Sequence, residues 1–261
     1  MSAVRQFGVV VVGDEILCGK RADKHLPHVI EALQARGMQV AWSRVVADNR
    51  KRLVHELKLT QLDALPVFCF GGIGATPDDQ TRQAAAEAFG TCLVKHPDAV
   101  AFIEDQFGED AYPDRIRMAD LPEECLLIPN PYNQIPGFTL YDHHYLPGFP
   151  SMAWPMLDWV LDRYYPGEAP MEVEKSVKVL HARESELVQL MDALSVAHPR
   201  AKLFSLPHMA EINSIEFGFR GEEAVVDAAF TDLVKALNSR ALVFQILNEG
   251  TVASALNQAA V

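Results

Sequence analysis

The sequence predicts an α/β fold with a mostly parallel sheet covered by helices, followed by a smaller α+β domain. Over the first part of the chain, apolar runs typical of buried strands alternate with amphipathic helical segments, the order that produces a parallel sheet with right-handed crossovers. Farther along, the predicted elements follow the order βαββαβ of the ferredoxin-like arrangement. We therefore expect two domains, at residues 1–166 and 167–261.

The first strand is predicted at residues 7–12, where FGVVVV is a continuous apolar run typical of a strand buried on both faces. It ends at the turn Gly13-Asp14-Glu15. Asp23 is then placed to cap a helix in which the apolar residues between 26 and 33 recur at helical spacing, with Gly37 at its end. The pattern indicates a helix that packs one face on the sheet.

Two further strands extend this pattern. One is predicted at 39–46, and Asp48 directly after it is placed to cap a helix over about residues 50–60. The other, at 65–70, leads into the glycine-rich stretch GGIGATPDDQT at 71–81 and then into a helix. The two leading glycines permit positive φ and close approach of a ligand to the backbone, and helix amides favour an anion there.

The segment between the third strand and the second domain is less regular. A helix is predicted at 98–107, short strands at 125–128 and 138–146, and a closing helix at 151–163. Residues 164–170 are typical of a linker. In the second domain we expect strands at 172–181, 201–206, 212–220 and 241–247, and helices at 184–195 and 222–236.

Composition and charge indicate which classes of partner and which location to expect. The formal net charge is -12, and both predicted domains carry more acidic than basic residues, so nucleic acid and anionic membranes are poor partners. The four cysteines form no C-x-x-C pair and indicate reduced thiols. The first apolar run is too short for a signal peptide and no stretch is long enough for a membrane span, so we expect a cytoplasmic protein.

The predicted strands bring polar loops to one edge of the sheet. In open parallel sheets, ligands bind outside the carboxyl ends of the strands, where Gly13-Asp14-Glu15, Asp48 and residues 71–79 would meet. Carboxylates there could hold Mg²⁺, which takes few protein ligands and completes its shell with phosphate oxygens. The alternative is that these are turn and helix-cap residues only, with Asp78 or Asp79 as an N-cap.

Two other sequence features give little support to a functional role. His143 and His144 point to opposite faces of a strand and cannot easily share a metal ion, so we expect one surface and one packed histidine. Trp154 and Trp159 on the closing helix are interpreted as packing residues. A serine hydrolase is not indicated, because no G-x-S-x-G is present.

Three stretches resemble a known family: GDEILCG at 13–19, GGIGATPDDQTRQA at 71–84 and LPGFPS at 146–151, with NPYNQIPGF at 130–138 as a weaker fourth. They are similar to the molybdopterin-binding family of molybdenum-cofactor biosynthesis, and most closely to the amino-terminal part of competence-damage-inducible A (CinA) proteins. The second domain resembles the middle domain of that family through LHARESEL at 180–187.

The resemblance implies a three-layer αβα domain that binds a phosphorylated pterin, such as molybdopterin, or an adenine nucleotide, with Mg²⁺ as a candidate cofactor, in a homo-oligomer. It also implies which residues of this sequence contact the ligand, take part in catalysis or hold the metal ion. The implied ligand-binding residues are Gly13, Asp14, Glu15, Gly71, Gly72, Gly74, Thr76, Pro147, Gly148 and Ser151, with Pro150 in the same loop. The implied catalytic residues are Asp79 and Asp48, and the implied metal ligands are Asp79, Asp48 and Asp14.

The family implies nucleotidyl transfer to molybdopterin or metal-dependent hydrolysis of ADP-ribose-type pyrophosphates. This sequence departs from the family's pattern at His25, Asn133, Ile135 and Met152, so the alternative is a non-catalytic binding or regulatory protein. A third interpretation, RNA binding by the second domain, is opposed by that domain's acidic charge. No residues correspond to the amidohydrolase domain of longer CinA proteins, and we do not expect deamidation of nicotinamide mononucleotide.

Overall fold

A computed structural model describes residues 4–166, 172–209 and 213–251 of the chain. It divides into two compact units, one made of Met1–Leu33 with Met38–Gly167 and the other containing Glu168–Val261. The predicted boundary at 166 and 167 adjoins residues 167–171, which lie outside the described part. Each unit has its own hydrophobic core and is described separately.

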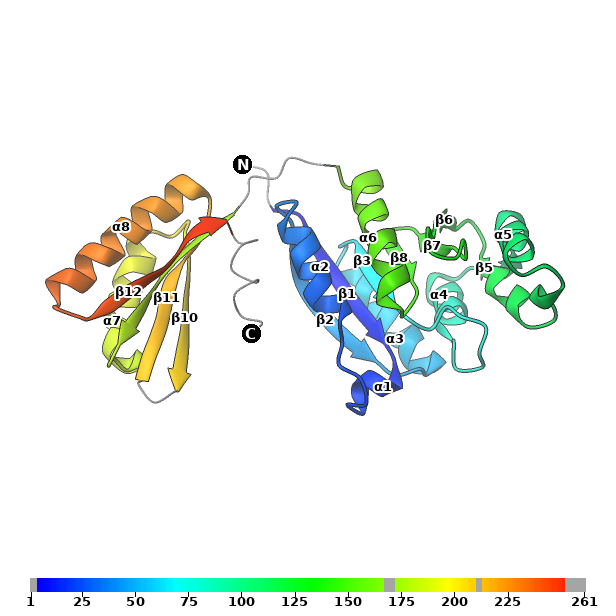
Figure 1. Ribbon diagram of the computed structural model, residues 1–261, viewed down its shortest axis with the longest axis horizontal. Coiled ribbons are helices and arrows are strands. Elements are labelled where there is room, and N and C mark those ends of the chain that lie inside the picture. The colour runs from blue at the N-terminus through cyan, green and yellow to red at the C-terminus, as the bar shows by residue number, and fades with distance from the viewer. Residues whose placement is uncertain (1–3, 167–171, 210–212, 252–261) are drawn as a thin grey trace. The chain divides into compact units, whose positions relative to one another are not determined.

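The first unit is built on a six-stranded sheet (Figure 1). In spatial order its strands are β2 (Gln39–Val46), β1 (Gln6–Val12), β3 (Val67–Phe70), β8 (His143–Leu146), β7 (Gly137–Leu140) and β6 (Leu126–Ile128). The first four run parallel, whereas β7 and β6 are antiparallel to their neighbours. The carboxyl ends of four strands therefore share one edge of the sheet.

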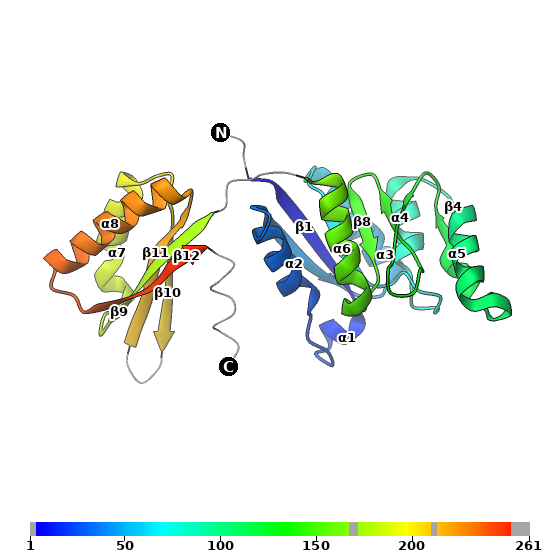
Figure 2. The ribbon, with the colours of Figure 1, turned by 45° about the horizontal axis from the view of Figure 1, so that its top comes forward.

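Helices cover both faces of this sheet. They are α1 (Asp14–Leu17), α2 (His25–Gln34), α3 (Arg50–Leu62), α4 (Thr81–Phe89), α5 (Pro97–Phe107) and α6 (Pro150–Tyr164). Alternate residues of β1 enter two separate cores: Val10 packs with residues of α3 and α4, and Val9 with residues of α2 and α6. Figures 1 and 2 show these helix pairs on either side of the strands. The predicted three-layer fold is confirmed.

The region after α4 contains elements that the sequence did not indicate. They are β4 (Leu93–Lys95), the 3-10 helices η1 (Gly108–Ala111) and η2 (Arg115–Ala119), and β5 (Asp120–Pro122), which pairs with β4. The predicted single strand at 138–146 is wrong. It is a hairpin of β7 and β8 that turns at Tyr141, whose φ of 51° is left-handed. β4 and β5 form a separate two-stranded sheet, and η1 and η2 pack against α5.

Both histidines of β8 are buried, which corrects the prediction that one lies on the surface. His143 Nε2 lies 2.8 Å from Thr60 Oγ1, and His144 Nδ1 lies 2.9 Å from Thr139 Oγ1. Tyr165 Oη lies 2.7 Å from His144 Nε2. Burial lowers the pKa of His143 to about 4 and that of His144 to about 3. They are uncharged core residues on opposite faces of the sheet.

The second unit has the predicted βαββαβ order. Its elements are β9 (Val173–Leu180), α7 (Glu184–Ala197), β10 (Lys202–Met209), β11 (Asn213–Gly221), α8 (Glu223–Ser239) and β12 (Phe244–Thr251). The strands form an antiparallel sheet in the order β10-β11-β9-β12. Both helices pack on one face of it, where Phe217 and Phe219 are fully buried. The predicted smaller α+β domain is confirmed.

No helix in the part of the chain that the structure describes combines the length and apolar character needed to cross a membrane.

Candidate functional site

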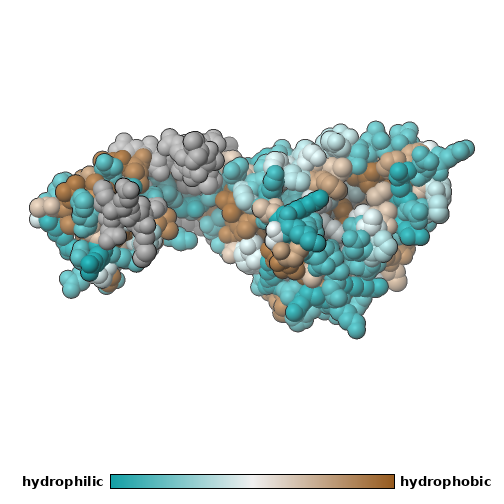
Figure 3. All heavy atoms as spheres, turned by 60° about the horizontal axis from the view of Figure 1, so that its bottom comes forward, coloured by the Kyte–Doolittle hydropathy of each residue, from teal (hydrophilic) through white to brown (hydrophobic). Residues whose placement is uncertain are grey.

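The loops that follow the parallel strands line a cavity of about 530 Å³ at the carboxyl edge of the sheet. This edge is turned toward the viewer in Figure 3, where apolar and hydrophilic residues lie side by side. The lining includes most residues implied by the sequence, namely Gly13, Glu15, Asp48, Gly71, Gly72, Gly74, Thr76, Asp79, Pro147 and Gly148. Asp14 and Ser151 are exposed and are not among the lining residues.

The acidic end of the cavity is organised around Asp48. Its Oδ2 accepts a hydrogen bond of 2.8 Å from the backbone amide of Asp14, which joins the ends of β1 and β2. Burial raises the pKa of Asp48, and the nearby carboxylates of Asp14, Glu15 and Asp78 raise it further, although the Asp14 amide acts in the opposite direction. Several carboxylates therefore crowd one end of the site, an arrangement that favours a cation.

Asp48 does not cap the next helix, which corrects the sequence prediction. The N-cap of α3 is Asn49, whose Oδ1 accepts a hydrogen bond of 3.1 Å from the amide of Arg52. With the capping position filled by its neighbour, the Asp48 side chain is free to turn toward β1. Asp23 does hold the start of α2, because its carboxylate accepts hydrogen bonds from the amides of His25 and Leu26.

The glycine loop (residues 71–79) lies tightly against the ends of the strands. Gly71 and Gly72 have φ of 99° and 68°, in the left-handed region that disfavours side chains. A Cβ on Gly71 would lie 2.5 Å from the carbonyl oxygen of Val12, and one on Gly72 would lie 2.2 Å from Thr81 Oγ1. Glycine is therefore required by sterics as well as by conformation.

Asp79 fixes the fold of the glycine loop. Its Oδ2 accepts hydrogen bonds from the amide of Thr76 at 2.9 Å and from Thr76 Oγ1 at 2.6 Å. A Cβ on Gly74 would lie 2.6 Å from the same oxygen, so the carboxylate needs a glycine beside it. The expectation that Asp78 or Asp79 caps the next helix is wrong, because the N-cap of α4 is Gln80.

Arg82 was not identified from the sequence, although it supports the glycine loop from beneath. Its guanidinium is buried and donates to the carbonyl oxygens of Gly74 at 2.6 Å and Asp120 at 3.1 Å, and also to that of Arg117. Ala85 and Ala86, three and four positions later on α4, are buried. That helical spacing was the available signal that Arg82 faces the interior.

Apolar side chains form a further part of the lining, the apolar wall of the cavity. They are Phe107, Met118, Ile135, Phe149 and Met152, and they come from α5, η2, the loop before β7, and the residue before α6 and its first turn. Phe149 is 60% exposed. Sequence reasoning missed Phe107 and Met118, which reach the site only through tertiary packing. An apolar wall of this kind suits the flat ring of a ligand, and the polar lining residues suit its other groups.

Three departures from the family pattern meet at this apolar wall. Asn133, Ile135 and Met152 all line the cavity, and Asn133 Nδ2 lies 3.8 Å from Met152 Sδ. The fourth departure, His25, is buried outside the lining, and burial lowers the pKa of its imidazole. The three altered lining residues therefore lie together in the site, whereas His25 stacks on Phe70, the residue directly before the glycine loop.

Charge is unevenly distributed among the lining residues. Arg21 is the only basic side chain of the lining, whereas Glu15, Asp48, Asp78 and Asp79 are acidic. Within the described residues, no group of three or more histidine, cysteine or acidic side chains is arranged to hold a metal ion by itself. A cation at the acidic end would take few ligands from the protein and the rest from water or a ligand's phosphates, as Mg²⁺ commonly does.

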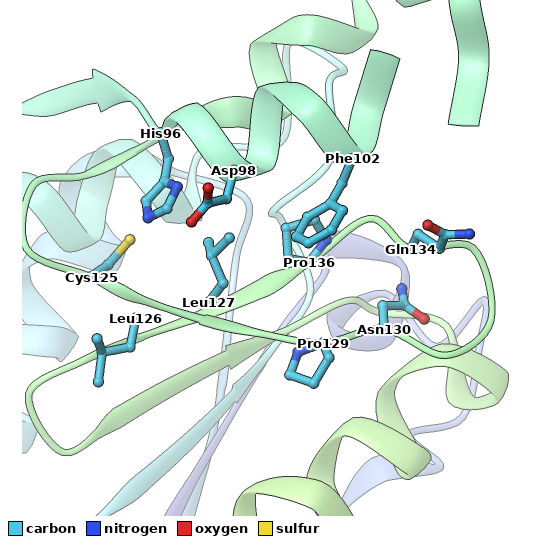
Figure 4. Close-up of a pocket in the computed structure, with 10 residues that line it drawn as sticks. All are labelled: His96, Asp98, Phe102, Cys125, Leu126, Leu127, Pro129, Asn130, Gln134 and Pro136. Carbon is cyan, nitrogen blue, oxygen red and sulfur yellow. The ribbon is translucent and has the colours of Figure 1, made fainter. Parts of the chain in front are cut away.

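A second hollow of about 450 Å³ lies between α5 and β6 (Figure 4). His96 is the N-cap of α5, Asp98 and Phe102 lie in α5, and Leu126 and Leu127 lie in β6. Asn130 and Pro136 line both hollows, so residues 130–136 separate them. The buried Asn130 side chain stabilises this segment, because it donates to Asn133 Oδ1 and to the Ile135 carbonyl oxygen.

The first unit matches a known protein family. Residues 8–166 match the family described as "Probable molybdopterin binding domain". A CinA-like protein from a Geobacter species is 29% identical over 218 residues, which are 80% of this chain and 53% of that protein. A CinA-like protein from Syntrophotalea carbinolica is 31% identical over 192 residues, 69% of this chain and 46% of that protein. The chain spans about half the length of these relatives.

Among solved structures, the crystal structure of CinA from Thermoplasma acidophilum, a protein of unknown function, is similar with a TM-score of 0.57 and 29% identity. The similarity covers 62% of this chain and 98% of that one. Its extent corresponds in size to the first unit. From the matched residues and the shared architecture, the chain belongs to the molybdopterin-binding domain family and is related to CinA-like proteins.

Proposed function

We propose that the first unit binds a small phosphorylated ligand, a molybdopterin-type pterin or an adenine nucleotide, and acts on its pyrophosphate bond with Mg²⁺. The observation that carries this proposal is that one cavity is lined by apolar side chains, by the glycine loop and by the carboxylates of Glu15, Asp48, Asp78 and Asp79. The wall suits a flat ring, and the amides after β3 suit phosphate oxygens.

The residues of the chain have separate roles in this proposal. The glycine loop, held by Asp79 and Arg82, presents the amides between Gly72 and Ala75 to the phosphates without first having to be ordered. Arg21 is placed to pair with a phosphate charge, and Phe149 to contact the ring. Bound Mg²⁺ would polarise a phosphorus centre or activate water. Asp48 is the strongest candidate to hold it, with Asp79 and Asp14 as further ligands.

The three candidate carboxylates, Asp48, Asp79 and Asp14, are not equally suited to hold Mg²⁺. The crowded carboxylates around Asp48 repel one another and would be relieved by a cation. Asp79 Oδ2 already accepts two hydrogen bonds from Thr76, so only its other oxygen is available. The Asp14 carboxylate is exposed and would have to turn toward the site. We therefore rank Asp48 above the other two as a metal ligand.

A thermal-shift screen tests the proposal. The purified chain is heated with molybdopterin-like compounds, ADP-ribose, FAD and ATP, each with and without Mg²⁺, and any stabilising compound is followed by product analysis. Stabilisation that requires Mg²⁺, with cleavage or formation of a pyrophosphate bond, is the expected result. Asp48→Asn should remove the Mg²⁺ dependence. Absence of stabilisation by every compound would reject the proposal.

A second candidate is a non-catalytic binding protein, favoured by the three altered residues of the apolar wall. Asn133, Ile135 and Met152 meet there and could retain a ring while losing the orientation that chemistry requires. This second candidate predicts that a ligand raises the melting temperature but that no product is formed. Multiple-turnover product formation would exclude it. Assembly into a homo-oligomer and a cytoplasmic location remain predictions.

A further inference from the structure

His25 occupies a fixed position behind the site. It is the first residue of α2 and is 5% exposed. The Asp23 carboxylate accepts hydrogen bonds from the backbone amides of His25 at 2.8 Å and Leu26 at 3.2 Å, which anchors the first turn of the helix. The imidazole is therefore carried by a backbone that is itself held in place.

The imidazole contacts residues at two of the loops that line the cavity, the loop after β8 and the glycine loop. Its Nε2 lies 3.1 Å from the carbonyl oxygen of Gly148, in the loop after β8. Its ring stacks on Phe70, with centroids 4.4 Å apart and planes 19° apart. Phe70 is the last residue of β3 and directly precedes Gly71. One side chain thus contacts the segment on each side of the site.

The two loops are themselves in close contact at this point. A Cβ on Gly148 would lie 3.4 Å from the Cα of Gly71, and the Gly71 amide donates to the carbonyl oxygen of Leu146 at 2.9 Å. A small displacement of residue 148 would therefore change the distance between the loops. The contact from His25 restrains that displacement from behind.

We infer that His25 is a positioning residue that sets the spacing between the glycine loop and the loop at 147–149. Because the Gly148 oxygen can only accept, Nε2 must carry the proton, and the buried Nδ1 has no partner. The imidazole therefore makes one directed contact, to Gly148, and one stacking contact, to Phe70. It acts on a ligand only through these loops, since it is not among the lining residues.

Variants can separate the two contacts. His25→Gln retains a donor near the position of Nε2, whereas His25→Phe retains a ring on Phe70 and loses the donor. His28→Phe is the matched control. His28 lies one turn farther along α2 and stacks on Trp154 at 4.1 Å, away from both loops. All three variants are first checked for an unchanged cooperative thermal transition.

The first measurement needs no ligand. In ¹H–¹⁵N spectra of the full chain, His25→Phe should move or broaden the amide resonances of Gly71 and Gly148, His25→Gln should shift them less, and His28→Phe should leave them in place. Unchanged resonances in His25→Phe would overturn the inference. Equal changes in all three variants would do the same, because they would indicate a general effect of altering α2.

The second measurement rests on the proposed function and uses ADP-ribose with Mg²⁺ as the probe. We expect affinity to fall tenfold or more in His25→Phe, to be largely rescued in His25→Gln and to stay within twofold in His28→Phe. Failure of the unaltered chain to bind this probe counts against the proposed function, while the spectra still decide the role of His25. Binding by the unaltered chain with affinity unchanged in His25→Phe would reject that role.

Discussion

The backbone amide of Asp14 donates to Asp48 Oδ2 across 2.8 Å and joins the ends of two adjacent parallel strands. Burial raises the pKa of the Asp48 carboxyl, and the neighbouring carboxylates of Asp14, Glu15 and Asp78 raise it further. Asp48 therefore has two effects on stability: its carboxylate accepts a structural hydrogen bond, and its negative charge destabilises the folded state.

Replacing Asp48 separates these two roles. Asn can still accept the hydrogen bond from Asp14 but carries no charge. A carboxyl whose folded pKa is raised destabilises the fold above that pKa, and the penalty disappears as pH falls below the unfolded value. We expect Asp48→Asn to melt at or above the temperature of the unaltered chain at pH 7, with the difference shrinking toward pH 4. Differential scanning calorimetry at both pH values measures this. A lower, pH-independent melting temperature would show that the charged hydrogen bond dominates.

Gly72 and Thr81 should be energetically coupled. Gly72→Ala places a Cβ against Thr81 Oγ1 and forces a left-handed φ, at a cost of about 2 to 4 kcal/mol. Thr81→Ala removes a buried hydroxyl oxygen that has no partner and should have a small effect alone. The double variant should recover about half of the loss, because only the steric part is relieved. Urea unfolding of the four proteins measures the coupling, and strict additivity would refute it.

The buried histidines of β8 should make the fold sensitive to acid. Because the pKa of His143 falls to about 4 in the folded state, the unfolded chain binds more protons than the folded one below about pH 6.5. Stability should fall between pH 6.5 and 4, by on the order of 3 kcal/mol for this residue. His143→Gln should show a shallower loss in urea unfolding at pH 7, 6 and 5. An identical slope in both proteins would contradict this assignment.

Phe149 should contribute to ligand binding without contributing to stability. Its ring is 60% exposed beside the apolar wall, so Phe149→Ser should leave thermal unfolding unchanged. Loss of ring stacking should weaken ligand binding by about tenfold, or ~1.4 kcal/mol. Leu62→Ser is the matched control, since Leu62 is 80% exposed at the end of α3. Isothermal titration with the ligand found by the screen measures the effect, and equal affinities for both variants would exclude a role for Phe149.

The sequence predicted the architecture because its strongest signals are local. The run before Gly13 is long and apolar enough to specify a buried strand, whereas the strand at 39–46 is the partly exposed edge strand of the sheet. Parallel order brings the loops after both strands to one edge. The hairpin at Tyr141 carries no such signal, because the turn lacks the glycine or asparagine that usually marks a left-handed residue. The sequence alone therefore predicts one strand over residues 138–146.

The sequence indicated the glycines and acidic residues of the site, but it did not indicate all of the apolar residues that line it. Glycines and acids next to strand ends are visible in the sequence, whereas Phe107 and Met118 reach the cavity through the packing of α5 and η2. The sequence also does not show which of two adjacent capping residues forms the N-cap of a helix. Asp48 and Asn49 are both good helix caps, and the structure uses Asn49, which leaves Asp48 for the site.

The buried guanidinium of Arg82 acts on more than the loop it holds. A positive charge surrounded by protein is screened by solvent far less than a charge on the surface, so its electric field extends through the glycine loop to the space above. That field opposes the negative potential of Asp48 and Asp79. It lowers the electrostatic work of bringing an anion to a rim lined with carboxylates, before any metal ion arrives.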